Sequence, residues 1–414
     1  MRGFCETRHG GEPPTRTECS EMRTALEVLF WMSAGLIVWT QLGYTLLIAL
    51  LARLLAPAPQ AAMATRERPI PPKNSVSLII AAHDEQGVIG AKVSNALALD
   101  YPRELLETIV ACDGCEDDTA ESARAAGADL VLELPRGGKI AAQDAAVEHS
   151  RGELVAFSDA NALWEPAALR ELVGAFADPR VGYACGQVRF VQAGEGAGAT
   201  NQEGLYWRYE MAMRERESRL CSITAGNGAI YATRRESYIA VDPIMGHDLS
   251  FPFNMVKRGW RAVYVPGARA VEKMVPSIEG ELARKRRMMS HTWPIVLRGG
   301  MLSPRGYTPG YALMIFSHRL LRYSTPFLHL LALAANIALV AGGAGRVGIP
   351  SIYTLTLALQ LVLLFAAGLG GVLPVRALLI ARYYVLTTAS PAVGLWDWLR
   401  HGTVASWEAA EGTR

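Results

Sequence analysis

The sequence predicts a membrane-bound α/β protein, in which a domain with a mostly parallel β-sheet lies between apolar membrane helices. Three observations support this prediction. Strand-length apolar runs alternate with helical patterns between residues 74 and 275. Apolar stretches long enough to cross a bilayer lie on both sides of that region. Hydrophobic residues make up 50% of the 414 residues and charged residues only 19%, which is apolar for a soluble enzyme.

The N-terminal part predicts a disordered extension and then a membrane span. Residues 1–24 are polar and rich in Gly, Pro and charge, which is typical of disorder. Residues 25–55 are almost wholly apolar and exceed the roughly 20 residues that cross a bilayer. Arg53 lies at the end of the span, and Arg66, Arg68 and Lys73 follow it. They predict a cytoplasmic side there by the positive-inside rule, with residues 56–73 as a Pro- and Ala-rich linker.

The domain at 74–275 alternates strand and helix patterns. Strands are expected at Val76–Ala82, 107–111, 129–132 and 153–158, with helical patterns between them. Strands that alternate with helices of this length predict a mostly parallel sheet with right-handed crossovers.

The fourth expected strand ends in Ser158-Asp159-Ala160-Asn161, and this stretch is the centre of the functional interpretation. Open α/β sheets bind ligands at the carboxyl ends of their strands. Oxygen-bearing side chains spaced i, i+2 on an extended chain point the same way, so Asp159 and Asn161 could hold a hard divalent cation. The alternative is that Asp159 is a helix N-cap or a turn residue.

Two other strands of this domain also end in acidic residues, namely Asp84-Glu85 and Asp113. Unpaired carboxylates gathered at one edge of a sheet are costly unless a cation or hydrogen-bond donors satisfy them. Three acidic strand ends therefore favour a ligand site over three separate turns.

Other chemistry is less favoured by the sequence. Cys112 and Cys115 have the spacing of a redox pair, but the Asp-Gly between them is better explained as a turn at a strand end. The net charge is only +2, and no basic stripe interleaved with aromatic residues predicts a nucleic-acid partner. The α/β region at 74–275 contains no dinucleotide or P-loop fingerprint.

Two motifs occur in the second half of the domain. Gly226-Asn227-Gly228 has glycine spacing that lets the backbone approach a ligand closely. Asp248 lies where a helix opens that is expected to run to Lys257. It could serve as a reactive carboxylate or simply as a negative charge at a helix N-terminus.

The C-terminal part predicts a return to the membrane. Residues 276–310 form a basic amphipathic segment whose run Arg284–Arg287 suits anionic lipid headgroups or phosphate. Residues 311–396 contain about three transmembrane or interfacial helices, and 397–414 form a tail. The layout predicts a multi-pass protein of the plasma or inner membrane with its α/β domain in the cytoplasm.

The order of these motifs resembles membrane-bound family 2 glycosyltransferases, the inverting group that includes hyaluronan, chitin, cellulose and poly-N-acetylglucosamine synthases. The resemblance covers residues 74–300 and the layout of the flanking membrane helices. It implies a GT-A fold, which is Rossmann-like, that binds a nucleotide-sugar donor with Mg²⁺ or Mn²⁺.

The resemblance also implies roles for single residues. Asp84, Glu85, Asp113, Lys139 and Asp159 correspond to donor-binding positions. Asp159 matches the first aspartate of the family's metal-binding D-x-D element, and Asn161 replaces the second. Gly226, Asn227 and Gly228 resemble the acceptor-site loop. Asp248 falls at the catalytic base, with His247 in place of the usual preceding acid.

The motif Q-x-x-R-W, which ends this region in processive members, is replaced here by Arg284–Met288. Arg286 and Arg287 could still neutralise the donor diphosphate. Because the tryptophan that seats a growing polymer is missing, we expect transfer of a single sugar to a lipid-linked, membrane-associated or other saccharide acceptor. Two alternatives stay open, a processive synthase with an export channel and a transporter or scaffold with a non-catalytic nucleotide-binding domain.

Elementary chemistry requires the same parts. A nucleoside diphosphate leaves with a large negative charge, so cations must face it. An acceptor hydroxyl is a poor nucleophile at neutral pH, so a carboxylate on the opposite face must take its proton.

Overall fold

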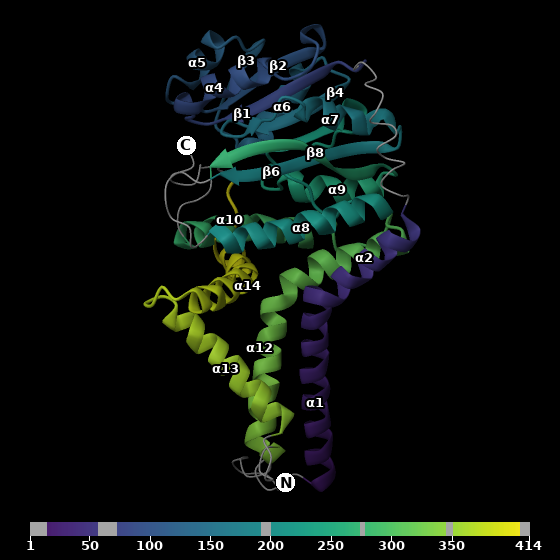
Figure 1. The fold of residues 1–414 in the computed structure, drawn as a ribbon, viewed down its shortest axis with the longest axis vertical. Coiled ribbons are helices and arrows are strands. Elements are labelled where there is room, and N and C mark those ends of the chain that lie inside the picture. The colour runs from purple at the N-terminus through teal and green to yellow at the C-terminus, as the bar shows by residue number, and fades with distance from the viewer. Residues whose placement is uncertain (1–14, 57–72, 192–199, 274–277, 345–350, 406–414) are drawn as a thin grey trace. The chain divides into compact units, whose positions relative to one another are not determined.

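The computed structural model describes residues 15–56, 73–191, 200–273, 278–344 and 351–405. The chain divides into two compact units. One comprises Met1–Leu46 with Phe316–Val393, and the other comprises Leu47–Ile315 with Gly394–Arg414. The first is helical and the second contains the sheet (Figure 1).

One eight-stranded sheet forms the centre of the α/β unit, in the order β3-β2-β1-β4-β7-β6-β8-β5. The strands are β1 (Val76–Ala82), β2 (Leu106–Asp113), β3 (Leu130–Leu134), β4 (Leu154–Asp159), β5 (Leu163–Trp164), β6 (Val181–Val191), β7 (Ile230–Arg234) and β8 (Arg261–Lys273). The first four run parallel, β7 is antiparallel to both of its neighbours, β6 is parallel to β8, and β5 is antiparallel to β8. The predicted mixed, mostly parallel sheet is confirmed.

Strand β7 is a feature that the sequence pattern did not predict. Residues 224–229 have too little side-chain bulk for an ordinary core strand, and the five residues Ile230–Arg234 that follow them lie between β4 and β6. Its first four residues are buried, and Tyr231 pairs with Phe157 of β4. The Gly226–Gly228 loop leads directly into this strand, so the loop is attached to the middle of the sheet.

Helices cover both faces of the sheet. On one face lie α4 (Gln86–Leu97), α5 (Thr119–Ala125) and α7 (Ala168–Gly174), whose apolar residues join the first core cluster. On the other lie α6 (Lys139–His149), α8 (Thr200–Leu220) and α9 (His247–Lys257), which contribute to the second. Strands β1 and β4 are buried along nearly their whole length because helices pack on both sides of them.

The end of the α/β domain differs in detail from the expected one. The last strand, β8, was not among the strands expected above and runs from Arg261 to Lys273. The basic segment forms α10 (Ile278–Leu297), which holds all four consecutive cations. The length of β8 brings Glu272 beside the turn that follows β4, because Val271 pairs with Leu163 of β5.

The N-terminal helix begins earlier than expected. Helix α1 (Arg16–Val38) starts after Thr15, whose side chain accepts a hydrogen bond from the Glu18 N–H in a capping box. The predicted disorder of residues 1–24 is therefore wrong from Arg16 onward, because the cap and apolar continuation stabilise a helix there. Residues 1–14 and most of the expected linker, 57–72, lie outside the described residues.

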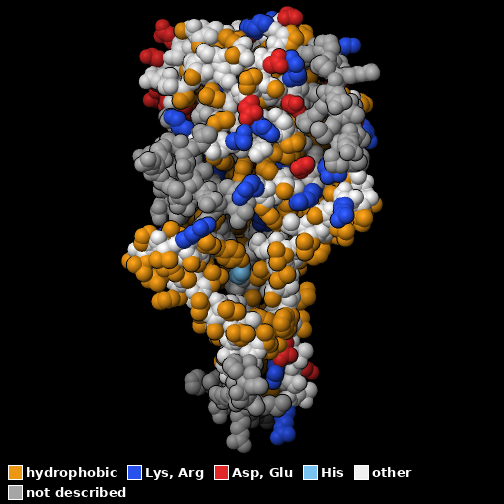
Figure 2. Space-filling view, in the orientation of Figure 1, with side chains coloured by type: hydrophobic (Ala, Val, Ile, Leu, Met, Phe, Trp, Pro, Cys, Tyr) orange, Lys and Arg blue, Asp and Glu red, His pale blue; other side chains and the backbone are white. Residues whose placement is uncertain are grey.

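Among the described residues, four helical stretches are long and apolar enough to cross a membrane: Arg16–Leu55, Pro309–Gly343, Ile352–Leu369 and Arg376–His401. They contain α1 and α2 (Tyr44–Leu55), then α11 (Pro309–Met314) and α12 (Leu321–Leu339), then α13 (Ile352–Leu369) and α14 (Arg376–His401). Apolar side chains cover much of the surface of the helical unit in Figure 2, and α13 exposes Leu359, Val362 and Phe365. Exposed apolar surface of this kind is typical of helices that face lipid.

Candidate active site

The carboxyl ends of β1, β2 and β4 meet at one edge of the sheet. In the parallel register, Ala81 of β1 lies opposite Asp159 of β4, and Ala82 lies opposite Cys112 of β2. The structure therefore brings the three acidic strand ends to one rim, where α/β sheets bind ligands.

Asp159 at this rim contacts the side chain of Lys139. The Lys139 ammonium pairs with Asp159 Oδ1 and also donates to the carbonyl of Gly228, 3.3 Å away. Lys139 is the first residue of α6 and follows Gly138, whose φ of +90° is in the left-handed region. The lysine thus joins the expected donor side to the expected acceptor loop.

Asp248 approaches the same loop from the first turn of α9. The Gly226 N–H donates to the backbone carbonyl of Asp248 over 2.6 Å. A Cβ placed on Gly228 would lie 3.8 Å from both the Asp248 Cβ and the Lys139 Nζ. Gly228 therefore lies between the predicted base and the lysine that pairs with Asp159, and its missing side chain leaves that space open.

The Gly226–Gly228 loop, the expected acceptor loop, is held by close packing and by one of its own side chains. A Cβ on Gly226 would overlap with the hydroxyl of Tyr183, so this position has no room for a side chain. Asn227 Oδ1 accepts a hydrogen bond from the Ala229 N–H at 3.0 Å, which fixes the turn into β7.

His247 next to Asp248 is buried and uncharged. Its Nδ1 is 2.7 Å from the hydroxyl of Tyr231, and its ring stacks on Phe251 with centroids 4.0 Å apart. Burial lowers the pKa of His247 to about 3, and the charge of Lys139 contributes to this shift. His247 consequently places no second charge beside Asp248.

Asp113 is fully buried and organises the loop that carries Lys139. Its carboxylate accepts hydrogen bonds from the N–H groups of Gly137 at 2.6 Å and Gly138 at 3.0 Å. The structure thus assigns Asp113 a positioning contact, whereas its contact with the nucleotide base stays a prediction.

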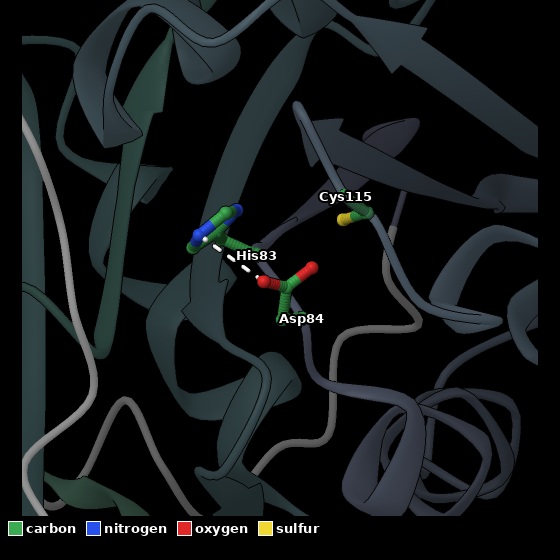
Figure 3. Close-up of side chains that lie close together, drawn as sticks. All are labelled: His83, Asp84 and Cys115. Carbon is green, nitrogen blue, oxygen red and sulfur yellow. Dashed lines mark ion pairs between the residues drawn. The ribbon is translucent and has the colours of Figure 1, made fainter.

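Asp84 has an unusual backbone conformation at the end of β1. Its φ is +49°, which is rare for a residue other than glycine. Its Oδ1 accepts the Glu116 N–H at 2.8 Å, and its Oδ2 lies 3.5 Å from His83 Nε2 (Figure 3). The neighbouring Glu85 is buried, and its N–H donates to the Thr119 hydroxyl.

Figure 3 also shows the thiol of Cys115 near His83 and Asp84. The His83 Nδ1–H donates to the Asp113 carbonyl at 2.8 Å, which ties this group to the β2 end. A hydrogen bond with Cys112 lowers the pKa of Cys115 to about 7. The described residues thus contain a His, Asp and thiol cluster that the cysteine spacing alone did not predict.

Two charged residues near Asp159, one buried and one half-buried, were missed by the sequence analysis. Lys92 on α4 is fully buried, and its ammonium donates to the carbonyl of Ala162 at 2.6 Å. Glu272 of β8 has a buried Oε1 with no hydrogen-bond partner among the described residues. The sequence carries a signal for the burial of Lys92. It lies three residues after Ile89 and four before Ala96, which places it on the apolar face of the helix.

These charges act on one another. Burial lowers the pKa of Lys92 to about 7, while the negative charges of Asp159 and Glu272 oppose the shift. Burial raises the pKa of Glu272 to about 7, and the charge of Asp159 raises it further. Lys139, Arg284 and Lys92 oppose the shift of Glu272. The turn after β4 is therefore surrounded by ionisable groups of both signs.

The residues at this turn fit a hard divalent cation. Asp159, Asn161 and Glu272 offer oxygen atoms, which are the ligands that Mg²⁺ and Mn²⁺ prefer. The Ala162 N–H donates to the Asp159 carbonyl at 3.2 Å, which closes the turn, and the Asn161 side chain is half-buried there. A cation would also satisfy the buried Glu272 Oε1.

The two predicted arginines lie on α10. Arg286 forms an ion pair with Asp397 near the end of α14, with Nη2 2.7 Å from Oδ1, and its side chain is 55% exposed. Arg287 is exposed on the same helix. Arg284 of the same run acts on the rim through its charge, which opposes the raised pKa of Glu272.

Sequence comparison identifies the family. A profile described as "Glycosyltransferase like family 2" matches residues 71–290, which is more than half of the chain. The chain belongs to glycosyltransferase family 2. The matched residues form a glycosyltransferase domain of this family.

Individual relatives resemble parts of this glycosyltransferase. Over 169 residues it is 30% identical to the beta-monoglucosyldiacylglycerol synthase of Synechocystis, an alignment that covers 37% of this chain and 33% of the relative. Its fold resembles that of the mannosyltransferase PcManGT from Pyrobaculum calidifontis, solved with GDP-mannose and Mn²⁺. That likeness has a TM-score of 0.62 at 20% identity and covers 92% of this chain and 99% of the other, which confirms the GT-A fold.

Proposed function

We propose that the enzyme transfers one sugar, with inversion, from a nucleotide-sugar donor to a hydroxyl of a lipid-linked or membrane-associated acceptor. The arrangement of Asp159 and Asp248 carries this proposal. They come from different elements, the end of β4 and the start of α9, and Lys139 and Gly228 lie between them. One carboxylate can serve the leaving group while the other serves the nucleophile.

The donor side would hold the nucleotide and its diphosphate. Asp159 and Asn161, with Glu272 as a third oxygen donor, would hold Mg²⁺ or Mn²⁺, which supplies positive charge to the departing diphosphate. Lys139 is a second cation at this position. Asp84, Glu85 and Asp113 line the neighbouring strand ends, where the nucleoside is expected. The Mn²⁺ in the mannosyltransferase with the same fold supports the choice of metal.

Asp248 would be the general base. The acceptor oxygen attacks the anomeric carbon while the bond from that carbon to the diphosphate oxygen breaks. The hydroxyl proton passes to the Asp248 carboxylate, and the nucleoside diphosphate leaves. Neutral His247 adds no negative charge beside this carboxylate, so the base is not forced to share a proton with a neighbouring acid.

The apolar helices would keep the enzyme at the bilayer where a lipid acceptor resides. Four helical stretches could span a membrane, and Arg53 and Lys73 flank the first of them on the side of the catalytic domain. Positive charge on that side would suit a cytoplasmic catalytic domain, where nucleotide sugars are made. The partial similarity to a synthase of a glucosyldiacylglycerol supports a lipid acceptor.

The test is transfer by the purified full-length enzyme in lipid nanodiscs. Labelled UDP-, GDP- and dTDP-sugars are offered with diacylglycerol or polyprenyl phosphate, and the product is analysed for length and anomeric configuration. We expect a single added sugar of inverted configuration. A long polymer would favour the processive alternative, and donor binding without turnover would favour a non-catalytic scaffold.

A further inference from the structure

Side chains of helix α4 form hydrogen bonds to the segment that follows Asp159. Lys92 donates to the Ala162 carbonyl at 2.6 Å, and its ammonium lies 5.2 Å from the centre of the Trp164 ring. One turn further along α4, Asn95 brackets Trp164, accepting from its N–H and donating to its carbonyl, both at 2.9 Å. The stretch from Asp159 to Trp164 is therefore attached to α4 at several points.

The burial of Lys92 needs an explanation, because lysine is almost never fully buried without a specific partner. Its side chain is 0% exposed. A methionine or leucine would fill the same volume without the cost of desolvating an ammonium. Stability alone therefore does not account for a lysine here. What distinguishes this side chain from an apolar one is the hydrogen bond to Ala162 and the charge near Asp159 and Glu272.

The hydrogen bond of Lys92 acts on the geometry of the metal-binding turn. Ala162 directly follows Asn161, and its N–H closes the turn onto the Asp159 carbonyl. Its own carbonyl points to Lys92 on the face of the sheet that α4 covers. Holding this carbonyl fixes the peptide that ends the turn. The hydrogen bond from Lys92 would thereby orient the side chains of Asp159 and Asn161 from the side of the sheet that α4 covers.

We propose that Lys92 is a positioning residue for the Asp159–Asn161 turn, which it holds through the Ala162 carbonyl so that the oxygen ligands meet the cation and the donor diphosphate. This inference rests on the proposed metal-dependent transfer and adds to it a residue that touches neither substrate nor metal. Replacing a group that orients a metal ligand without touching the metal typically lowers metal affinity roughly 10- to 100-fold.

The test is Mn²⁺ binding to the full-length enzyme in nanodiscs, measured calorimetrically with Mn²⁺ alone and again with UDP or GDP present. Lys92→Met keeps the volume and removes the donor and the charge. If Lys92 positions the turn, Mn²⁺ affinity falls roughly 10- to 100-fold. Charge alone predicts the opposite, because losing a nearby cation strengthens binding of Mn²⁺.

Asn95→Ala is the matched control, since it loosens the same segment from the same helix at Trp164 and changes no charge. We expect a lower melting temperature with Mn²⁺ affinity close to that of the wild type. Unchanged or tighter Mn²⁺ binding by Lys92→Met would overturn the proposal, even if its melting temperature falls. If Lys92→Met does not fold, Lys92→Arg keeps the charge but moves the donor, and unchanged Mn²⁺ affinity would again overturn it.

The two levels of the proposal fail differently. Absence of Mn²⁺ binding and of sugar transfer in the wild-type enzyme would remove the metal-dependent function and this inference with it. Normal binding and transfer by the wild type, together with normal Mn²⁺ affinity of the Lys92 variants, would remove only the role of Lys92.

Discussion

The proposed donor and acceptor sides of the site differ in the residues and contacts that form them. On the donor side, carboxylates at strand ends are satisfied by backbone N–H groups and cations, as Asp113 is by Gly137 and Asp159 is by Lys139. On the acceptor side, Gly226 packs against the Tyr183 ring, and Asp248 lies in the first turn of α9. The difference teaches that the donor side is organised to balance charge, whereas the acceptor side is organised by close packing near the proposed proton acceptor Asp248.

The largest effect is expected on the donor side. Asp159→Ala removes the oxygen ligand and the partner of Lys139, so turnover should fall by at least roughly 10²-fold, together with the Mn²⁺-dependent affinity for nucleoside diphosphate. Transfer assays and nucleotide titration check this. Asp100→Ala, which removes an exposed ion pair with Arg170, is the control and should be nearly neutral. Near-normal turnover of the Asp159 variant would mean that Asp159 only stabilises the turn after β4.

The next largest effect is expected at Asp248. Asp248→Asn keeps the shape and removes the basicity, so the single-turnover rate should fall roughly 10²- to 10⁴-fold. If Asp248 were only a helix N-terminal charge, the variant would lose about 0.3–1 kcal/mol of stability and keep its turnover. Rapid-quench measurement of one round of transfer distinguishes the two roles.

A smaller effect is expected from filling the acceptor loop. Gly226→Ala forces a methyl group against the Tyr183 hydroxyl, which should destabilise the fold by roughly 1–3 kcal/mol and shift the loop. The readouts are the melting temperature and the KM for the acceptor. Gly90→Ala on α4 meets open space and should be neutral or slightly stabilising. Equal behaviour of the two variants would mean that the close packing at Gly226 is not needed.

The smallest effect concerns pH and His247. The folded pKa of about 3 lies below the unfolded value of about 6.5, so the unfolded state binds a proton that the folded state does not. This group therefore lowers stability as pH falls from about 6.5, by up to about 1.4 kcal/mol per pH unit. His247→Phe should remove that component from the difference between melting curves at pH 7.5 and pH 5. An unchanged difference would mean that His247 is protonated in the fold.

The sequence predicts the donor side better than the acceptor side, for a physical reason. Buried parallel strands that end in Asp84, Asp113 and Asp159 leave a local signal, and the structure places all three ends at one rim. Strand β7 leaves a weaker signal, because it has only five residues and directly follows the small residues 224–229. The attachment of the acceptor loop to the middle of the sheet is thus a tertiary property.

Long-range charge pairing is equally hidden in the sequence. Lys92 and Glu272 are 180 positions apart and meet near Asp159 only because β8 extends to Lys273 and α4 packs under β4. For the run Arg284–Arg287, the sequence resemblance and the contacts in the structure point to different residues. Sequence resemblance favours Arg286 and Arg287 as diphosphate partners, whereas helical phase directs Arg284 toward Glu272 and pairs Arg286 with Asp397.

The most direct test of the division of labour compares Asp159→Ala and Asp248→Asn in one experiment, by titrating both purified variants with the active nucleotide-sugar donor in Mn²⁺ and following single-turnover transfer. The account predicts that the Asp159 variant loses donor affinity and that the Asp248 variant binds donor normally but transfers roughly 10²- to 10⁴-fold more slowly. Loss of donor affinity in both variants, or normal transfer by the Asp248 variant, would contradict it.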